Sequence, residues 1–361
     1  MREEIELVVA GNEASDLLPV HDATLLAAHG ASQGFWTVLD EGPVEDCLAL
    51  LLQRPDGSWT AHHQSCDAGA EIGRTEDGEA LAHHDGHVYV IGSHFGSKRG
   101  PLRPRRAFVA RFPEAAAASG PAPLEIVRNK FRLHRIINEA LAGVPLTQPG
   151  ELVSERFIAA TRARGAARGK AWTSRLAVGD VPVNVEGAAF TPAGTLLLGL
   201  RFPVAADGSP LLVELADVPA MFGPARSWPT VVGVHVLTGA TGPGELTGVR
   251  ALSARPDGAY DAVVGSIDAL GKESAVLDDH PAGGEITSRH VRFRLPGSLV
   301  SPPPARSGCG AAVPERRWPL VLPVERIADL APLHHVEGLA ETNGVRHYVT
   351  DEDHRITLFH T

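Results

Sequence analysis

The clearest structural pattern in the chain is "NVEGAAFTPAGTLLLGLRFP", which runs from Asn184 to Pro203. It opens with a polar residue, and Glu186 follows two positions later. A small and apolar run, a glycine turn and a second apolar run come next, and the unit ends in a charged residue. Two short apolar runs around a glycine-containing turn are typical of two antiparallel strands.

The same pattern occurs in other parts of the chain. The clear copies are "DGEALAHHDGHVYVIGSHFG" (77–96) and "HHVEGLAETNGVRHYVTDEDH" (334–354), with Glu79 and Glu337 at the glutamate position. Two weaker copies, "VHDATLLAAHGASQGFWTVLDEG" and "TGVRALSARPDGAYDAVVGSID", place Asp22 and Arg250 there. Repeats of about 40 to 50 residues are typical of propellers. We therefore predict a single all-β domain, a β-propeller of five blades, while five to seven blades fit the chain length.

Three departures from the repeat are expected. Residues 130–180 contain "HRIINEALAGV" and "ELVSERFIAATRARG", whose apolar spacing predicts a helical insertion. The N-terminal "IELVV", residues 5–9, is predicted to close the last blade as its outer strand, which would protect an exposed edge. The last unit is expected to begin at about residue 319.

Composition limits the partners and the compartment. The net charge of −10 argues against nucleic acid and anionic membranes as main partners, although "SKRGPLRPRR" (97–106) is a local basic stretch. Three cysteines give no disulfide framework, and we expect free thiols. The N-terminus does not resemble a signal peptide, and no apolar run reaches membrane-span length. We expect a cytoplasmic monomer or homodimer that binds a small molecule in its central channel.

The repeated position contains four carboxylates and one arginine. If the first strand of each blade lines the channel, then Asp22, Glu79, Glu186 and Glu337 gather around Arg250. Four like charges need a countercharge, which a divalent cation such as Ca²⁺ would supply. A contribution from His335 or His94 would favour Mn²⁺, Fe²⁺ or Zn²⁺ instead. The alternative is a scaffold role, in which the carboxylates accept hydrogen bonds from the backbone of the neighbouring blade.

A second group of polar residues follows the apolar strands and varies in type from one unit to the next. Arg201 is suited to pair with a carboxylate or phosphate, and His94 to act as a general acid or base. We predict catalytic roles for His94, Arg201 and Asp351. The predicted substrate-binding residues are Asp40, Glu41, Ser93, Arg250, Asp268 and His335.

At these motifs the chain resembles a bacterial family of uncharacterised proteins, the domain-of-unknown-function family 3616. The resemblance depends on "HDATLLA", "FWTVLDE", "ALAHHDGHVYVIGSHFGSKRGPLRPRR", "VNVEGAAFTPAGTLLLGLRFP", "GVRALS" and "VEGLAE". It implies a β-propeller and no established reaction. From the residues we predict a metal-dependent hydrolase of a small acidic or phosphorylated metabolite, acting at the channel mouth. The alternatives are a non-catalytic propeller that binds a ligand or protein, and a tailoring enzyme of secondary metabolism.

Overall fold

The fold is described from a computed structural model of the chain. It covers residues 3–7, 14–39, 42–268, 273–296, 318–333, 335–352 and 355–361. All structural statements below refer to these residues.

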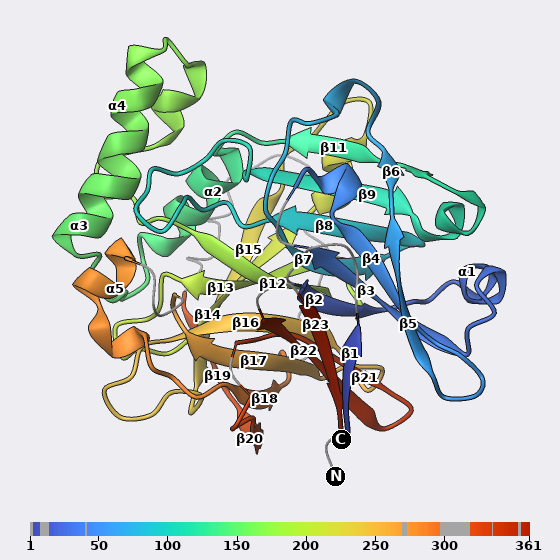
Figure 1. Cartoon of the computed structure of the whole chain (residues 1–361). Helices are drawn as coiled ribbons and strands as arrows, with labels where there is room; N and C mark the ends of the chain where they lie inside the picture. Colours follow the sequence, from blue (N-terminus) through green and yellow to red (C-terminus); the bar gives the residue numbers. More distant parts are fainter. Residues whose placement is uncertain are drawn as a thin grey trace, which may run out of the picture.

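Five antiparallel sheets account for most of the strands (Figure 1). The first sheet contains β2 (Ala14–Pro19), β3 (Gln33–Leu39), β4 (Leu48–Gln53) and β5 (Trp59–Gln64). The second contains β7 (Gly78–His84), β8 (His87–Gly92), β9 (Phe108–Pro113) and β11 (Glu125–Arg128). The third contains β12 (Asn184–Phe190), β13 (Leu196–Phe202), β14 (Leu211–Ala216) and β15 (Thr230–Thr238). The fourth contains β16 (Thr247–Ala254), β17 (Tyr260–Ser266), β18 (Arg289–Phe293) and β20 (Glu325–Asp329). The fifth contains β21 (Val336–Thr342), β22 (Val345–Glu352), β23 (Arg355–His360) and β1 (Glu3–Leu7).

The five sheets form a closed ring. Their first strands contact one another in the cyclic order β2, β7, β12, β16, β21 and back to β2. Each sheet then continues outward through its antiparallel neighbours, as in the blades of a propeller. The predicted all-β propeller is therefore confirmed.

Two strands pair with a sheet that is built mainly from another part of the chain. β1 pairs with β23, so the two ends of the described chain lie in the fifth sheet. β19 (Leu320–Pro323) pairs in parallel with β15 as a fifth strand of the third sheet, and β20 then joins the fourth sheet. The expectation that the last unit starts at about residue 319 is therefore wrong, because the fifth sheet begins at β21.

Short helices and one small strand pair connect the sheets. The α-helices are α1 (Ala23–Ala28), α2 (Arg132–Leu141), α3 (Glu151–Val153), α4 (Ala160–Ala167) and α5 (Ala275–Asp279). A π-helical turn, η4 (Ser154–Ala159), joins α3 to α4. The 3₁₀ turns are η1 (Val44–Asp46), η2 (Gly69–Glu71), η3 (Glu114–Ser119), η5 (Ala171–Arg175), η6 (Val218–Phe222) and η7 (Pro281–Gly283). β6 (Cys66–Asp67) pairs in parallel with β10 (Ala122–Pro123). Helices α2 to α4 belong to the segment 130–180, which connects the last strand of the second sheet to the first strand of the third (Figure 1).

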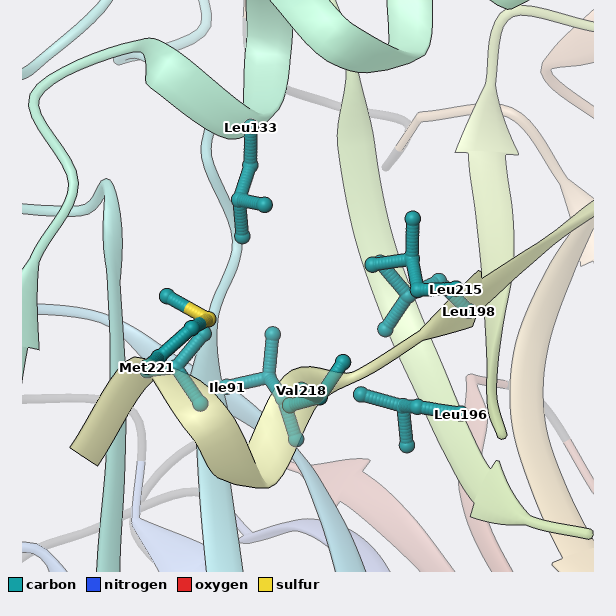
Figure 2. Close-up of a pocket in the computed structure, with 8 residues that line it drawn as sticks. Ile91, Leu133, Leu196, Leu198, Leu215, Val218 and Met221 are labelled. Atoms are coloured by element: carbon teal, nitrogen blue, oxygen red, sulfur yellow. The ribbon is translucent and has the colours of Figure 1, made fainter. Parts of the chain in front are cut away.

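Apolar side chains fill the spaces between neighbouring sheets. Figure 2 shows one such region, where Ile91 from β8, Leu198 from β13 and Met221 from η6 point toward one another beneath Leu133 of α2. The space between them has no room for a water molecule. This region is therefore packed core and not a ligand site. None of the described helices is long and apolar enough to cross a membrane.

Candidate functional site

Each of the five inner strands contains a β-bulge close to its start. The bulge lies between Gly78 and Ala80 in β7, and in β12 it follows Val185. A bulge takes a residue out of the regular pairing and re-aims its side chain. The residues at the bulges are all charged types: Asp16, Glu79, Glu186, Arg250 and Glu337. The repeated position is therefore a structural feature of every sheet.

Asp22 does not belong to this set, and its predicted position in the first unit is wrong. Its side chain accepts a hydrogen bond of 2.8 Å from the backbone N–H of Leu25, so it is the N-cap of α1. Asp followed by "ATLLAA" is a good helix start, because the carboxylate satisfies a free N–H and alanine and leucine favour the helix. The inner strand lies earlier, and Asp16 occupies the bulge.

Asp16 connects the first sheet to the second. Its carboxyl accepts hydrogen bonds from the backbone N–H groups of Leu81 in β7, at 2.6 Å, and of Leu17, at 2.8 Å. The residue is 1% exposed and adopts a left-handed backbone conformation, with φ of 61°. Burial raises the pKa of Asp16 to about 8, although the two hydrogen bonds oppose the shift. Asp16 thus has the scaffold role that the sequence offered as an alternative, in which a carboxyl accepts a hydrogen bond from the backbone of the neighbouring sheet.

A chain of polar contacts links the other sheets. Glu337 in β21 forms an ion pair with Arg250 in β16 and accepts a hydrogen bond of 3.2 Å from the Ser15 hydroxyl in β2. On its other side, the Arg250 Nε lies 3.6 Å from the Glu186 Oε2 in β12. All of these side chains are buried. Arg250 therefore places one guanidinium group between two buried carboxylates.

Arg201 at the end of β13 is the second buried cation. Its Nη1 donates a hydrogen bond of 2.6 Å to Glu186 Oε1, and its Nε donates one of 3.3 Å to the Ser266 carbonyl. Burial alone would lower the pKa of Arg201, but the carboxylates of Glu186, Asp268 and Glu79 outweigh burial and raise it. Arg201 therefore lies within electrostatic range of carboxylates from the second, third and fourth sheets.

Asp77, which directly precedes β7 of the second sheet, has a carboxyl group that lies between a serine and an arginine. It accepts a hydrogen bond from the Ser93 hydroxyl, and its Oδ2 lies 2.8 Å from the Arg106 Nη1. Burial raises the pKa of Asp77 above its usual range, and the nearby Glu186 carboxylate adds to the shift, while Arg106 and Ser93 oppose it. The side chain is 12% exposed, so solvent still reaches it.

The charges of this group do not balance. We call these residues the channel cluster; it contains five carboxyl groups and three guanidinium groups, namely Asp77, Glu79, Glu186, Asp268 and Glu337 with Arg106, Arg201 and Arg250. The cluster thus has an excess of negative charge when all are ionised, and one fewer negative charge when Asp77 is protonated. An anionic substrate would be repelled here, so this charge balance does not favour the predicted acidic or phosphorylated metabolite.

A pocket of about 350 Å³ opens beside the cluster, between the fourth and fifth sheets. Arg250 and Ser266 form its inner wall, residues 284–288 line it before β18, and His335 lines it before β21. The volume is sufficient for a small molecule. Apolar and polar groups both line it, as is usual where a ligand is oriented by a few hydrogen bonds.

His94, for which we predicted a catalytic role, is buried within the fold. His94 is 1% exposed, and both ring nitrogens are engaged, with Nδ1 at 2.7 Å from the Gly92 carbonyl and Nε2 at 2.8 Å from the Asn129 Nδ2. Burial lowers the pKa of His94 to about 4, so the ring is neutral at physiological pH and has no free nitrogen for a substrate. The geometry therefore does not support its predicted catalytic role.

Ser93 and Asp268 are buried close to the cluster. Ser93 donates to Asp77, and Asp268 accepts a hydrogen bond from the Ser274 hydroxyl at the start of α5. Asp40 and Glu41 lie outside the described residues. Asp351 lies in β22, but nothing about its side chain is described.

The predicted metal site does not fit these residues. Asp22 lies elsewhere, and Glu186 and Glu337 already contact Arg250, whose guanidinium group takes the place of a cation. Within the described ranges no group of three or more His, Cys, Asp and Glu side chains is arranged to hold a metal ion. Arginines supply part of the charge compensation for which we predicted a divalent cation.

This arrangement has a direct test. We expect that dialysis against EDTA leaves the melting temperature of the purified protein unchanged within about 1 °C, because Glu186 and Glu337 are already paired with arginine. Differential scanning calorimetry before and after dialysis, with elemental analysis of both samples, measures this. A stoichiometric divalent metal whose removal lowers the melting temperature would contradict the arginine account.

Comparisons with known proteins give weak likenesses. No family model and no curated protein sequence matches the chain. An exo-1,5-α-L-arabinanase from a bovine ruminal metagenomic library is 12% identical over 98% of this chain and 94% of its own, with a TM-score of 0.42. A GH43 β-1,3-galactosidase with galactodeoxynojirimycin is 10% identical over 96% and 90%, also with a TM-score of 0.42. Native Bacillus subtilis arabinanase is 12% identical over 97% and 95%, with a TM-score of 0.38. Likenesses this low do not indicate a substrate or reaction for this chain, and the resemblance to family 3616 stays a prediction.

Three residues of this region were not among the predicted site residues. Asp16 is preceded by a short "EAS" segment that matches the repeat only if the first unit is moved six residues earlier. Asp77 stands two positions before Glu79, as Asn184 does before Glu186, so the repeat itself contained that signal. Arg106 lies in a basic loop, and no sequence pattern pairs it with Asp77.

Proposed function

We propose that this protein is a hydrolase that uses acid–base catalysis at the channel mouth on a small, uncharged, hydroxyl-bearing ester, lactone or glycoside. One observation carries the proposal: Asp77 is a solvent-reachable carboxyl with a raised pKa, beside a second carboxylate, Glu186. A carboxyl whose pKa is raised beside ionised neighbours is suited to proton donation. The negative balance of the channel cluster favours an uncharged substrate.

Each group has a defined role in this proposal. Asp77 donates its proton to the leaving oxygen as the bond to the reacting carbon breaks. Glu79, which is partly exposed, accepts a proton from the water whose oxygen bonds to that carbon. Asp77 recovers its proton through solvent as Glu79 releases one. Glu186 transfers no proton, because Arg201 and Asn184 both donate to its Oε1 and Arg250 lies beside its Oε2.

Backbone strain at Asp77 and His335 supports a functional role. Asp77 and His335 have φ angles of 66° and 52°, in the left-handed region that non-glycine residues rarely adopt. Both stand two positions before a bulge glutamate, in different sheets. Strain of this kind costs about 1–3 kcal/mol per residue and is concentrated at functional sites. His335 also lines the pocket.

The test is substitution of Asp77 combined with a substrate panel. The panel holds p-nitrophenyl butyrate, neutral p-nitrophenyl glycosides and γ- and δ-lactones, with p-nitrophenyl phosphate as the anionic comparison. We expect turnover of a neutral substrate, and a kcat lowered about 10²- to 10⁴-fold in Asp77→Asn, which keeps the hydrogen-bond acceptor but not the acid. Wild-type kcat should fall as pH rises through the raised pKa of Asp77, because the proton donor is then lost.

Asp56→Asn is the matched control, because Asp56 is an exposed carboxylate in the turn between β4 and β5 and accepts hydrogen bonds from Ser58. It should leave kcat unchanged. Equal kcat values for Asp77→Asn and wild type would refute the assigned role. Binding of panel compounds without turnover would instead favour a non-catalytic ligand-binding propeller.

A further inference from the structure

Two basic segments that are far apart in sequence pack against each other. Residues 97–106 and 156–175 contain eleven lysine and arginine residues and no acidic residue, so the rest of the chain has a net charge of −21. The backbone N–H of Leu102 donates a hydrogen bond of 2.9 Å to the Thr161 hydroxyl, and Gly100 lies directly against the backbone of Arg156. The charge distribution is therefore strongly uneven.

The two segments differ in how their charges are used. In the loop 97–106, Arg103 and Arg106 lie 3.2 and 3.5 Å from Glu76, and Arg99 pairs with Glu273. In the insertion, five cations have no ion pair and no side-chain hydrogen bond with any described residue. We call these residues the basic face: Arg164, Arg168 and Lys170 are exposed, and Arg156 and Arg162 are half-buried, with the Arg162 Nε buried.

The basic face lies on an element that stands away from the ring. Figure 1 shows α4 projecting at the outer edge of the molecule, beyond α3. The exposed positions of α4 and the turn after it, up to Ala171, are alanine, arginine, lysine and glycine. A protein interface is usually anchored by large apolar or aromatic side chains, and so is a helix that inserts into a membrane surface. This surface offers none, but it offers guanidinium groups without partners.

We propose that the basic face binds the phosphate backbone of nucleic acid, without sequence preference. Arginine presents a fork of donors that matches phosphate oxygens, and small residues between the arginines let a backbone approach closely. Arg164 in α4 and Arg168, the residue that caps its C-terminus, are four positions apart and so lie on the same side of the helix end, with Cβ atoms about 6 Å apart. The polar side chains of this face are arginine and lysine alone, without the Asn, Gln, Asp or Glu that would distinguish adenine or cytosine in the major groove. The inference is independent of the proposed hydrolase activity.

The proposal predicts weak binding that is very sensitive to salt. Nonspecific complexes have dissociation constants of about 10⁻⁴ to 10⁻⁶ M at physiological salt. With at most five phosphates neutralised on a duplex, the slope of log K against log salt should be about −4. The acidic remainder of the chain confines contact to this face. Net charge alone predicted no nucleic-acid partner, and this face is the local exception.

The experiment is fluorescence anisotropy with a fluorescein-labelled 20-base-pair DNA duplex of random sequence, titrated with the full chain between 50 and 200 mM NaCl. We expect saturable binding at 50 mM NaCl. The triple variant Arg164→Glu/Arg168→Glu/Lys170→Glu should bind at least about tenfold more weakly and show a shallower salt slope. These side chains are exposed, and an unchanged circular dichroism melting curve will show that the variant folds.

A matched triple variant separates location from net charge. Arg74→Glu/Arg294→Glu/Arg326→Glu changes the net charge equally, at exposed residues on other parts of the surface. It should bind the duplex within about twofold of wild type. Equal losses in both triple variants, or no binding at 50 mM NaCl, would overturn the proposal. Sedimentation with vesicles of phosphatidylcholine and phosphatidylserine, in the absence of duplex binding, would also overturn it in favour of an anionic membrane.

Discussion

Arg250→Met is expected to lower the free energy of unfolding by about 3–5 kcal/mol. Methionine has a similar volume but leaves two carboxylates, Glu186 and Glu337, in a buried site without the cation that lies between them. Removing one partner of a buried ion pair is costly at this level, because the other charge stays desolvated. Urea unfolding followed by circular dichroism measures the change.

Two further variants show whether charge is the cause. Arg250→Met/Glu337→Gln removes one of the stranded charges and should recover part of the loss. Arg346→Met breaks an ion pair with Glu341 near the surface, where the distance is 3.8 Å, and should cost no more than about 1 kcal/mol. If Arg250→Met costs no more than the surface variant, the two buried carboxylates do not depend on the arginine.

Asp16→Asn is expected to change how stability depends on pH. The folded pKa of Asp16, about 8, is far above the ordinary value of 3.8 in the unfolded chain. The stabilisation from its protonated form is complete below pH 3.8 and is lost as pH rises through 8. Asparagine keeps the acceptor oxygen for the Leu81 N–H and does not ionise. Between pH 5 and 7 the variant should therefore gain about 1.4 kcal/mol per pH unit relative to wild type.

Urea titrations of both proteins at pH 5, 6 and 7 test this directly. Asp16→Ala is the companion variant, because it leaves the N–H groups of Leu81 and Leu17 without their acceptor. It should be less stable than Asp16→Asn at every pH by about 1–3 kcal/mol. Parallel stability curves for wild type and Asp16→Asn would mean that Asp16 does not take up a proton on folding.

The repeat was sufficient to predict the propeller, because a bulge needs the same short pattern each time: a polar or charged side chain inside a small and apolar run. In the first unit the pattern indicated Asp22 as the bulge residue, because the apolar run "ATLLAA" fits a strand as well as a helix. The preceding "ASDLLP" contained the correct residue, and an N-cap reading of Asp22 would have identified it.

The chemistry of the site was harder to predict. The sequence placed Arg250 among the carboxylates. It did not reveal that Arg201, fifteen residues from Glu186, would also pair with that glutamate. Nor did it indicate that both nitrogens of His94 are used within the fold. Such pairings depend on the distance between sheets, which no local pattern specifies. The sequence therefore could not show that arginines would lie beside two of the carboxylates proposed as metal ligands, and the metal site stays a prediction.

The parallel pairing of β19 with β15 has a consequence for the order in which the protein folds during synthesis. The chain up to residue 296 holds every strand of the first two sheets, but the third sheet still lacks its edge strand and the fourth lacks β20. Residues 320–329 complete both at once, and β1, which is synthesised first, finds its partner only after β23 has been made. Nascent chains therefore carry open sheet edges until late in translation, a stage at which pairing with other chains competes with folding.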